Sequence, residues 1–153
     1  MQAFIYTFII GMIPILELRG AIPFGVASGL TIPEAYITAV IGNILPLPFV
    51  ILFIRKVFRF IKRHIPKLNS LVDRVENKIH KNGDKIKISK FRKFGLFIFV
   101  AIPLPGTGGW TGAMIAAFLD MRLKDAIFPL FLGVATAGMI MVSITHGASV
   151  LLF

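Results

Sequence analysis

The sequence contains no cysteine among its 153 residues. This excludes disulfide bonds, thiolate nucleophiles and thiolate metal ligands. The three histidines, His64, His80 and His146, are far apart and show no HExxH-type spacing, so we expect neither a metal nor a cofactor. Because the sequence also offers no nucleophile–base pair, we expect that the chain is not an enzyme.

Charge is almost absent from the first thirty residues, where Glu17 and Arg19 are the only charged side chains. Residues 35–54 and 126–153 contain none at all. A run of about 20 apolar residues is long enough to cross a bilayer core of about 30 Å. The start of the chain lacks the basic region of a cleaved signal peptide. We therefore expect an integral, multi-pass protein of the cell (inner) membrane.

Acidic residues are scarce, with seven Asp and Glu against 17 Lys and Arg, and 14 of these basic residues lie in the segment 55–93. The positive-inside rule indicates a cytoplasmic loop that contacts anionic lipids of the inner leaflet, rather than a nucleic-acid site. Within 65–90 the apolar residues fall on one helical face: Leu68, Leu71, Val72, Val75 and Ile79. We expect an amphipathic linker helix on the membrane surface, with a partner-binding helix as the alternative.

Two clusters of helix breakers interrupt the apolar halves, MIPILELRGAIP at 12–23 and AIPLPGTGGWTG at 101–112. The apolar stretches beside the second cluster, Phe94–Ile102 and Trp110–Leu119, are each long enough to cross only half a bilayer. Such lengths predict a re-entrant hairpin, which would keep Arg122 and Lys124 on the cytoplasmic side. By the same reasoning, both termini would lie outside.

The two halves also resemble each other. IPILELRG aligns with IPLPGTGG at an offset of 89, and Ala35 and Gly42 align with Ala126 and Gly133 at an offset of 91. The expected fold is an all-α membrane protein of one domain, built from two inverted repeats. In chain order its parts are a re-entrant hairpin at 1–31, a transmembrane helix at 33–62, the linker helix at 65–90, a second hairpin at 93–120 and a transmembrane helix at 122–152. Inverted repeats with broken helices are typical of secondary transporters.

The pair Glu17 and Arg19 is the first part of a candidate site. Side chains two residues apart diverge on a regular helix but can converge in a turn. They could form a buried pair that holds the hairpin together. Alternatively, Arg19 binds an anionic group and Glu17 takes up or releases a proton, because ionisable residues inside membranes are usually functional. Both interpretations can hold together.

The glycine-rich second cluster is the other part. Glycine N–H groups, threonine hydroxyls and an indole N–H can bind an anion, helped by half-helices that begin near Ala21 and Trp110 and direct their positive ends to the midplane. Asn43 either lines the site or bonds to the neighbouring hairpin. The predicted substrate-binding residues are Arg19, Gly20, Asn43, Gly106, Thr107, Gly108, Gly109, Trp110 and Thr111, with Glu17 as the proton-coupling residue.

The motifs ELRGAIPFG (17–25), GNILPLP (42–48) and AIPLPGTGGWTGA (101–113) resemble, in this order and spacing, the small multidrug export protein family of prokaryotes. The family name implies drug efflux. More remotely, the hairpin-plus-helix arrangement is similar to the DedA/VTT superfamily. That resemblance implies movement of phospholipids or polyprenyl-phosphate carriers with proton coupling, and a carboxylate and an arginine in re-entrant loops, to which Glu17 and Arg19 would correspond.

These observations lead to one main hypothesis and two alternatives. The main one is a small, proton-coupled secondary transporter with a midplane site for an anionic, phosphate-bearing or amphiphilic substrate. The alternatives are an exporter of cationic lipophilic drugs and a non-transporting membrane organiser or assembly factor that docks through the basic helix. Broken backbone inside a membrane needs protein around it, so we expect a homodimer or higher homo-oligomer.

Overall fold

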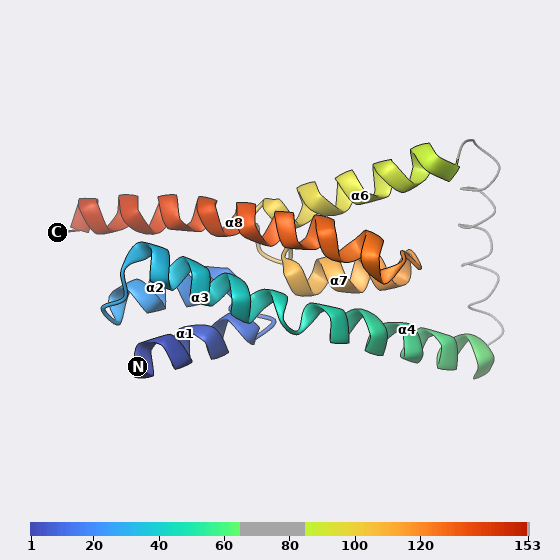
Figure 1. Ribbon diagram of the computed structural model, residues 1–153, viewed down its shortest axis with the longest axis horizontal. Helices are drawn as coiled ribbons and strands as arrows, with labels where there is room; N and C mark the ends of the chain where they lie inside the picture. Colours follow the sequence, from blue (N-terminus) through green and yellow to red (C-terminus); the bar gives the residue numbers. More distant parts are fainter. Residues whose placement is uncertain (65–84, 153) are drawn as a thin grey trace.

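The computed structural model describes residues 1–64 and 85–152, and this part of the chain is helical with no strands. The helices before the gap are α1 (Gln2–Met12), α2 (Glu17–Ala27), α3 (Ile32–Ile44) and α4 (Leu47–His64). Those after it are α6 (Lys85–Ala101), α7 (Gly109–Phe118) and α8 (Leu123–Leu152) (Figure 1). The all-helical class predicted from the sequence is confirmed.

Helices α1 and α2 form an antiparallel pair whose turn, residues 13–16, lies near the middle of the molecule (Figure 1). Ile13 ends α1 in an extended conformation, and Pro14 follows it. Helix α2 begins at Glu17, four residues earlier than the start predicted near Ala21. It continues through Pro23, which leaves the Arg19 carbonyl without its helical donor.

Helices α6 and α7 form the second antiparallel pair, and their turn, residues 102–108, also lies near the middle of the molecule (Figure 1). We call residues 13–16 the first turn and residues 102–108 the second turn. Helix α6 begins at Lys85, so the predicted half-helix Phe94–Ile102 is the end of a longer helix. The first part of the predicted linker helix, residues 65–84, lies outside the described residues.

The helices after the turns, α2 and α7, end in the same way. The N–H groups of Gly29 and Leu30 donate to the carbonyls of Val26 and Gly25, and those of Asp120 and Met121 donate to Ala117 and Ala116. This is the Schellman pattern, which requires a left-handed residue just after the helix. Gly29 with φ +91° and Asp120 with φ +49° supply it. These two positions are separated by 91 residues, the same offset that relates Gly42 to Gly133.

Helix α3 starts with a capping box in which the Thr31 N–H and hydroxyl both donate to Glu34, at 2.8 and 2.7 Å. The predicted transmembrane helix 33–62 is divided into two helices, because α3 ends at Ile44 and α4 begins at Leu47. Pro46 and Pro48 cannot donate to the preceding helical turn. Leu45 keeps helical dihedral angles, so the chain continues in nearly the same direction (Figure 1).

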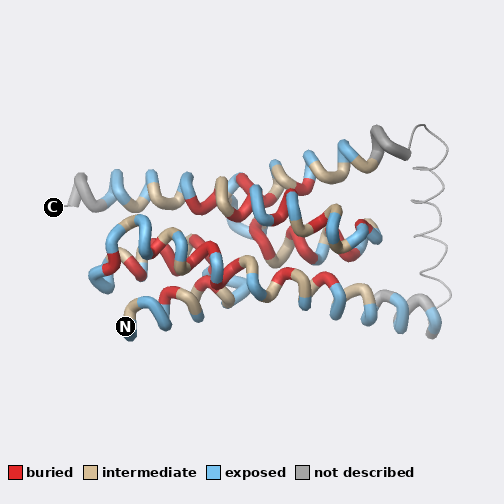
Figure 2. Tube along the Cα trace, viewed as in Figure 1, coloured by how far each residue is buried: buried red, intermediate tan, exposed pale blue. Residues whose placement is uncertain are grey.

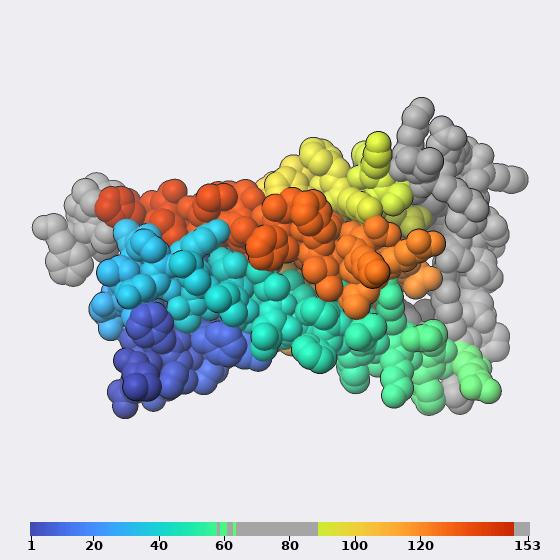
Figure 3. Space-filling view, viewed as in Figure 1, coloured from blue at the N-terminus to red at the C-terminus, as the bar shows by residue number. Residues whose placement is uncertain are grey.

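Helix α8 runs along α2, α3 and α6, and Figure 3 shows its atoms lying against those of α3. Buried residues gather on the inward faces around the two turns (Figure 2). The largest fully buried apolar side chains are Ile22, Leu47, Ile51, Val100, Leu130 and Val134. Two segments of 26 residues, Ile32–Val57 and Leu123–Ala148, are long and apolar enough to cross a membrane.

Two glycines let helices approach closely at equivalent places in the halves. Added to Gly42 of α3, a Cβ would collide with the Phe8 carbonyl of α1. At Gly133 of α8 it would lie 2.7 Å from the Val100 Cβ of α6. In each half, therefore, the first helix of the pair packs against the long segment that follows through a glycine contact.

Candidate functional site

The Glu17 carboxylate crosses from the first helix pair to the second. Its Oε1 accepts a hydrogen bond from the backbone N–H of Trp110, at 3.1 Å, in the first turn of α7. Glu17 itself has φ +44°, an unusual conformation for a residue other than glycine. Only 8% of the residue is exposed. The negative charge is thus placed at the N-terminus of α7, where unpaired N–H groups and the helix dipole favour it.

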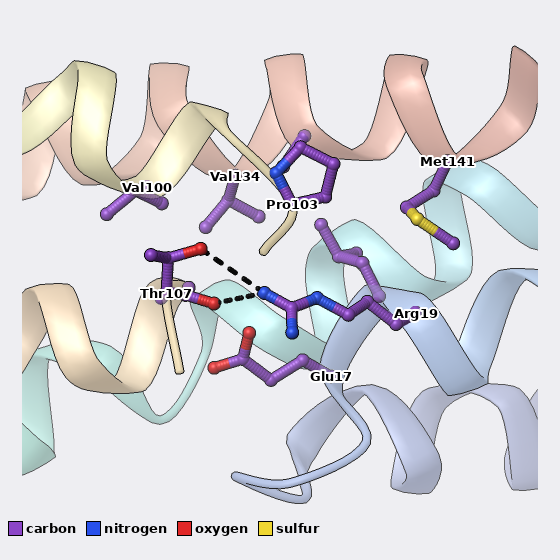
Figure 4. Close-up of a pocket in the computed structure, with 11 residues that line it drawn as sticks. Glu17, Arg19, Val100, Pro103, Thr107, Val134 and Met141 are labelled. Atoms are coloured by element: carbon purple, nitrogen blue, oxygen red, sulfur yellow. Dashed lines mark hydrogen bonds between the residues drawn. The ribbon is translucent and has the colours of Figure 1, made fainter. Parts of the chain in front are cut away.

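Arg19 crosses between the same two helix pairs in the same direction, toward the second turn. Its Nη2 donates to the carbonyl of Leu104. It also donates to the carbonyl of Thr107 and to the Thr107 hydroxyl, the latter at 3.3 Å (Figure 4). These acceptors lie in the second turn, after the C-terminus of α6. The positive charge therefore binds carbonyl groups of the second turn, while the negative charge of Glu17 binds the N-terminus of α7.

Glu17 and Arg19 do not form a salt bridge with each other in the part of the chain that the structure describes. This differs from the buried pair considered above. Each charge has its own hydrogen-bond partner in the second half, the second turn for Arg19 and the N-terminus of α7 for Glu17, while the Arg19 charge also acts on the Glu17 carboxylate. The two residues hold the second turn rather than only their own.

Further contacts between the turns depend on Trp110 and two glycines. The Trp110 indole Nε1 donates to the Met12 carbonyl at 3.1 Å, at the end of α1. A Cβ on Gly108 would overlap the Glu17 carboxylate, and one on Gly109 would overlap Oδ1 of Asn43. The absence of these side chains allows the charged residue and α7 to meet at hydrogen-bonding distance.

Asn43 of α3 is fully buried beside this contact. Its amide lies near enough to the Glu17 carboxylate to act on it, yet neither Nδ2 nor Oδ1 makes a hydrogen bond of ordinary geometry. A buried amide without partners is costly, by about 1–3 kcal/mol for each polar group. We therefore treat the buried Asn43 amide as a candidate ligand-binding group.

A small cleft of about 250 Å³ opens between the two halves at this point (Figure 4). One wall is polar and comes from Glu17, Arg19, Thr107, Gly108 and Gly109. The other is apolar and comes from Leu18, Val100, Pro103, Val134, Ala137 and Met141. Most of this volume is open to the surroundings, and the room that could hold the centre of a water molecule is about 10 Å³, roughly what one water needs.

The predicted site residues are thus divided into three groups. Those that line the cleft are Glu17, Arg19, Thr107, Gly108 and Gly109, and those that adjoin Glu17 are Asn43 and Trp110. The remaining three, Gly20, Gly106 and Thr111, are not among the lining residues. Gly20 instead lies against Leu16 and Ile10, and Gly106 has open space around it.

The apolar wall from α6 and α8 was missed in the sequence. One signal could have indicated it: Val134 stands 91 residues after Asn43, the offset of the repeat. Both side chains lie against Gly109, since a Cβ there would be 3.2 Å from the Val134 Cγ2. Equivalent positions of the two halves therefore meet at the same glycine.

The sequence model of one protein family, described as "Putative small multi-drug export protein", matches residues 17–140. The match begins at Glu17 and includes both charged residues, the second turn and most of α8. Neither the curated proteins nor the solved structures contain a match to the chain. The family and the two long apolar segments support a location in a membrane. The chain belongs to the small multi-drug export protein family.

Proposed function

We propose that the protein is a small secondary transporter that moves an amphiphilic anion and couples this movement to a proton on Glu17. In this proposal the α1–α2 and α6–α7 pairs are re-entrant hairpins, and the two halves are inverted repeats. One observation carries it: the two charged residues of the first half both bind the second half, Arg19 at the second turn and Glu17 at the N-terminus of α7. Broken helices that meet at such a contact are typical of transporter sites.

The proton on Glu17 would switch the contact between two states. As an anion, Glu17 accepts the Trp110 N–H and is stabilised by the α7 dipole. Protonation of Glu17 removes its charge and weakens its hydrogen bond to the Trp110 N–H, while Arg19 keeps its own bonds to the second turn. The halves can then move relative to each other, which is the two-state behaviour that alternating access requires.

The cleft supports an amphiphilic substrate with a small anionic group. Arg19 and the N-terminus of α7 supply positive charge on one wall, and α8 supplies Val134, Ala137 and Met141 on the other. With Glu17 bound to Trp110 the cleft has room for about one water molecule, so in this proposal a headgroup enters when that hydrogen bond is released. The acyl chains would extend along the apolar surface of the protein in the bilayer.

Proteoliposomes containing fluorescent phosphatidic acid provide the test, with a membrane-impermeant quencher reporting lipid movement between leaflets. We expect the protein to speed the movement, and Glu17→Gln and Arg19→Ala to slow it by about tenfold or more, since tenfold corresponds to about 1.4 kcal/mol. Glu34→Gln is the matched control, because glutamine also completes a capping box far from the cleft. Equal rates for Glu17→Gln and the unchanged protein would contradict proton coupling at Glu17.

Export of cationic lipophilic drugs is the second candidate, and the family description favours it. Such a substrate would need Glu17 free to pair with a cation, as happens with a membrane carboxylate that exchanges a proton for a drug. Ethidium efflux from the same proteoliposomes distinguishes the two. Efflux that requires Glu17, without any movement of phosphatidic acid, would replace the anionic substrate by a cationic one.

A further inference from the structure

We infer that the Glu17 carboxylate occupies the place of the substrate's phosphate group, so that the N-terminus of α7 binds either Glu17 or a phosphate but not both. This inference rests on the proposed function and names the chemistry of its binding step. We call this binding site the seat. It consists of the first N–H groups of α7, the Nη1 and Nε groups of Arg19 and the Asn43 amide. The apolar wall of the cleft then accepts the first part of an attached alkyl chain.

The first turn of α7 has the donors that a phosphate needs. The N–H groups of Gly109, Trp110 and Thr111 precede the first bond that closes the helix, which Gly112 makes to Gly108. Trp110 donates to Glu17, and Gly109 lies close enough to act on the same carboxylate. Helix N-termini of this kind bind phosphate and carboxylate by the same N–H groups and the same dipole. An oxyanion already bound there shows what the seat accepts.

Arg19 has N–H groups beyond those of Nη2 that can bind a phosphate. All of its hydrogen bonds within the described residues come from Nη2. Its Nη1 and Nε carry further N–H groups, and the side chain lines the cleft. A phosphate in the seat would thus gain a charge-assisted bond from Arg19 without breaking the contacts that hold the second turn.

Asn43 is a separate observation that points to a polar ligand at this place. It is fully buried, its Oδ1 lies against Gly109 in the first turn of α7, and both of its amide atoms lack hydrogen-bond partners. A phosphate oxygen can accept from Nδ2, and a protonated phosphate oxygen can donate to Oδ1. In the place of Glu17, the ligand would therefore give this buried amide the hydrogen bonds of ordinary geometry that it lacks with the carboxylate.

Competition for one seat links the proton to the anion. Arg19 of α2 is the one charged side chain that acts on Glu17 in the described structure. The segments α3, α6, α7 and α8 contribute uncharged groups around it: Asn43, Val100, Trp110, Val134, Ala137 and Met141. When Glu17 takes one proton from water, it loses its charge and releases the seat. A phosphate then enters, and it leaves again when Glu17 gives up the proton.

The single tryptophan of the chain, Trp110, is a built-in reporter because it touches the seat through its backbone and α1 through its indole. We would titrate the purified full chain in a neutral detergent with dodecyl phosphate and follow its fluorescence. Binding should be about tenfold tighter near pH 5 than near pH 8. Glu17→Gln should bind as tightly near pH 8 as the unchanged protein does near pH 5, and its own pH series corrects for titration of the probe.

Three further variants define the seat. Arg19→Ala and Asn43→Ala should weaken binding in the Glu17→Gln background, while Glu34→Gln should leave it unchanged. Inorganic phosphate is the second probe: if it binds as well as dodecyl phosphate, the seat stands and takes free phosphate rather than a lipid-like headgroup. Dodecyltrimethylammonium is the third, and tight binding of this cation in place of both anions overturns the seat.

One result would contradict this inference without contradicting the proposed transport. If Glu17→Gln binds dodecyl phosphate no more tightly than the unchanged protein near pH 8, Glu17 does not occupy the seat, even where the protein moves phosphatidic acid. Should this variant fold poorly, the pH series of the unchanged protein decides, and pH-independent binding overturns the inference too. Tight, Glu17-dependent binding without lipid movement would instead contradict the proposed transport and leave the seat in place.

Discussion

The backbone conformation of Glu17 is related to its hydrogen bond with Trp110 in the second helix pair. A φ of +44° costs a residue with a Cβ about 1–2 kcal/mol relative to ordinary helical geometry. Asparagine would tolerate this conformation better, but its side chain is shorter by one methylene group. The longer carboxylate reaches the Trp110 N–H from the start of α2. We therefore interpret the backbone strain at Glu17 as a consequence of its hydrogen bond to the Trp110 N–H.

Gly108 allows a direct test of this contact. An alanine there would place its Cβ on the Glu17 carboxylate, so we expect Gly108→Ala to lower stability by about 2 kcal/mol or more. Gly106→Ala is the matched control, since Gly106 also has positive φ but open space around it. Denaturation of both variants, with and without Glu17→Ala, gives the measurement. Our account fails if Gly108→Ala is equally costly in both backgrounds, because the collision partner is then not Glu17.

At the scale of the elements, the same local devices appear in both halves. A left-handed residue ends the second helix of each pair, and a glycine brings the first helix against the segment that follows. These features recur at an offset of 91 although the residues differ, as Gly29 and Asp120 show. The equivalence supports our proposal that the halves are repeats of one structural unit.

The left-handed position after α2 predicts opposite effects for two similar substitutions. Gly29 and Gly95 both have open space where a Cβ would be, and they differ in that Gly29 has φ +91°. Gly29→Ala should destabilise the protein by about 1 kcal/mol. Gly95→Ala, inside α6, should stabilise it by about 0.5–1 kcal/mol. Thermal unfolding in detergent measures both, and a stabilising Gly29→Ala would show that the α2 end does not need a left-handed residue.

Taken as a whole, the molecule has two different ends. Both termini lie at one end, and the other end holds the end of α4, the start of α6 and the connection from α7 to α8 (Figure 1). The second end carries the basic residues and the Lys93–Asp125 salt bridge of 2.6 Å. Apolar residues at the turns stay exposed, with Ile15 at 86% and Leu104 at 55%. Because broken backbone inside a membrane needs protein around it, we propose that a second copy of the chain covers these turns.

The absence of cysteine makes the sidedness of these ends measurable. We expect single cysteines in place of Gln2 and Gly147 to react with a membrane-impermeant maleimide from outside intact cells. Cysteines in place of Lys90 and Lys124 should react only after the cells are opened, because the positive-inside rule places the basic end in the cytoplasm. All four positions are exposed. Labelling of Lys90→Cys and Lys124→Cys from opposite sides would mean that 93–120 crosses the membrane, and the re-entrant hairpin would be wrong.

Much of the architecture was predictable because it depends on local signals. Prolines and glycines marked both turns, and the predicted helix start at residue 33 is close to the start of α3 at Ile32. The predicted start near Ala21 was wrong, because α2 begins at Glu17 and continues through Pro23. The interruption at Leu45–Pro46 needed the structure too, since a proline alone does not distinguish a kink from a break.

The sequence by itself determined that the chain is apolar, helical and interrupted twice, and that Glu17 and Arg19 are isolated charges in an apolar half. It could not determine their partners, because residues 17 and 19 are local to each other while Leu104, Thr107 and Trp110 are about 90 positions away. Only the packing of the two helix pairs decided that Arg19 binds carbonyl groups of the second turn and that Glu17 binds the N-terminus of α7. The physical reason is that a helix terminus offers a charge its partner only when tertiary structure brings the two together.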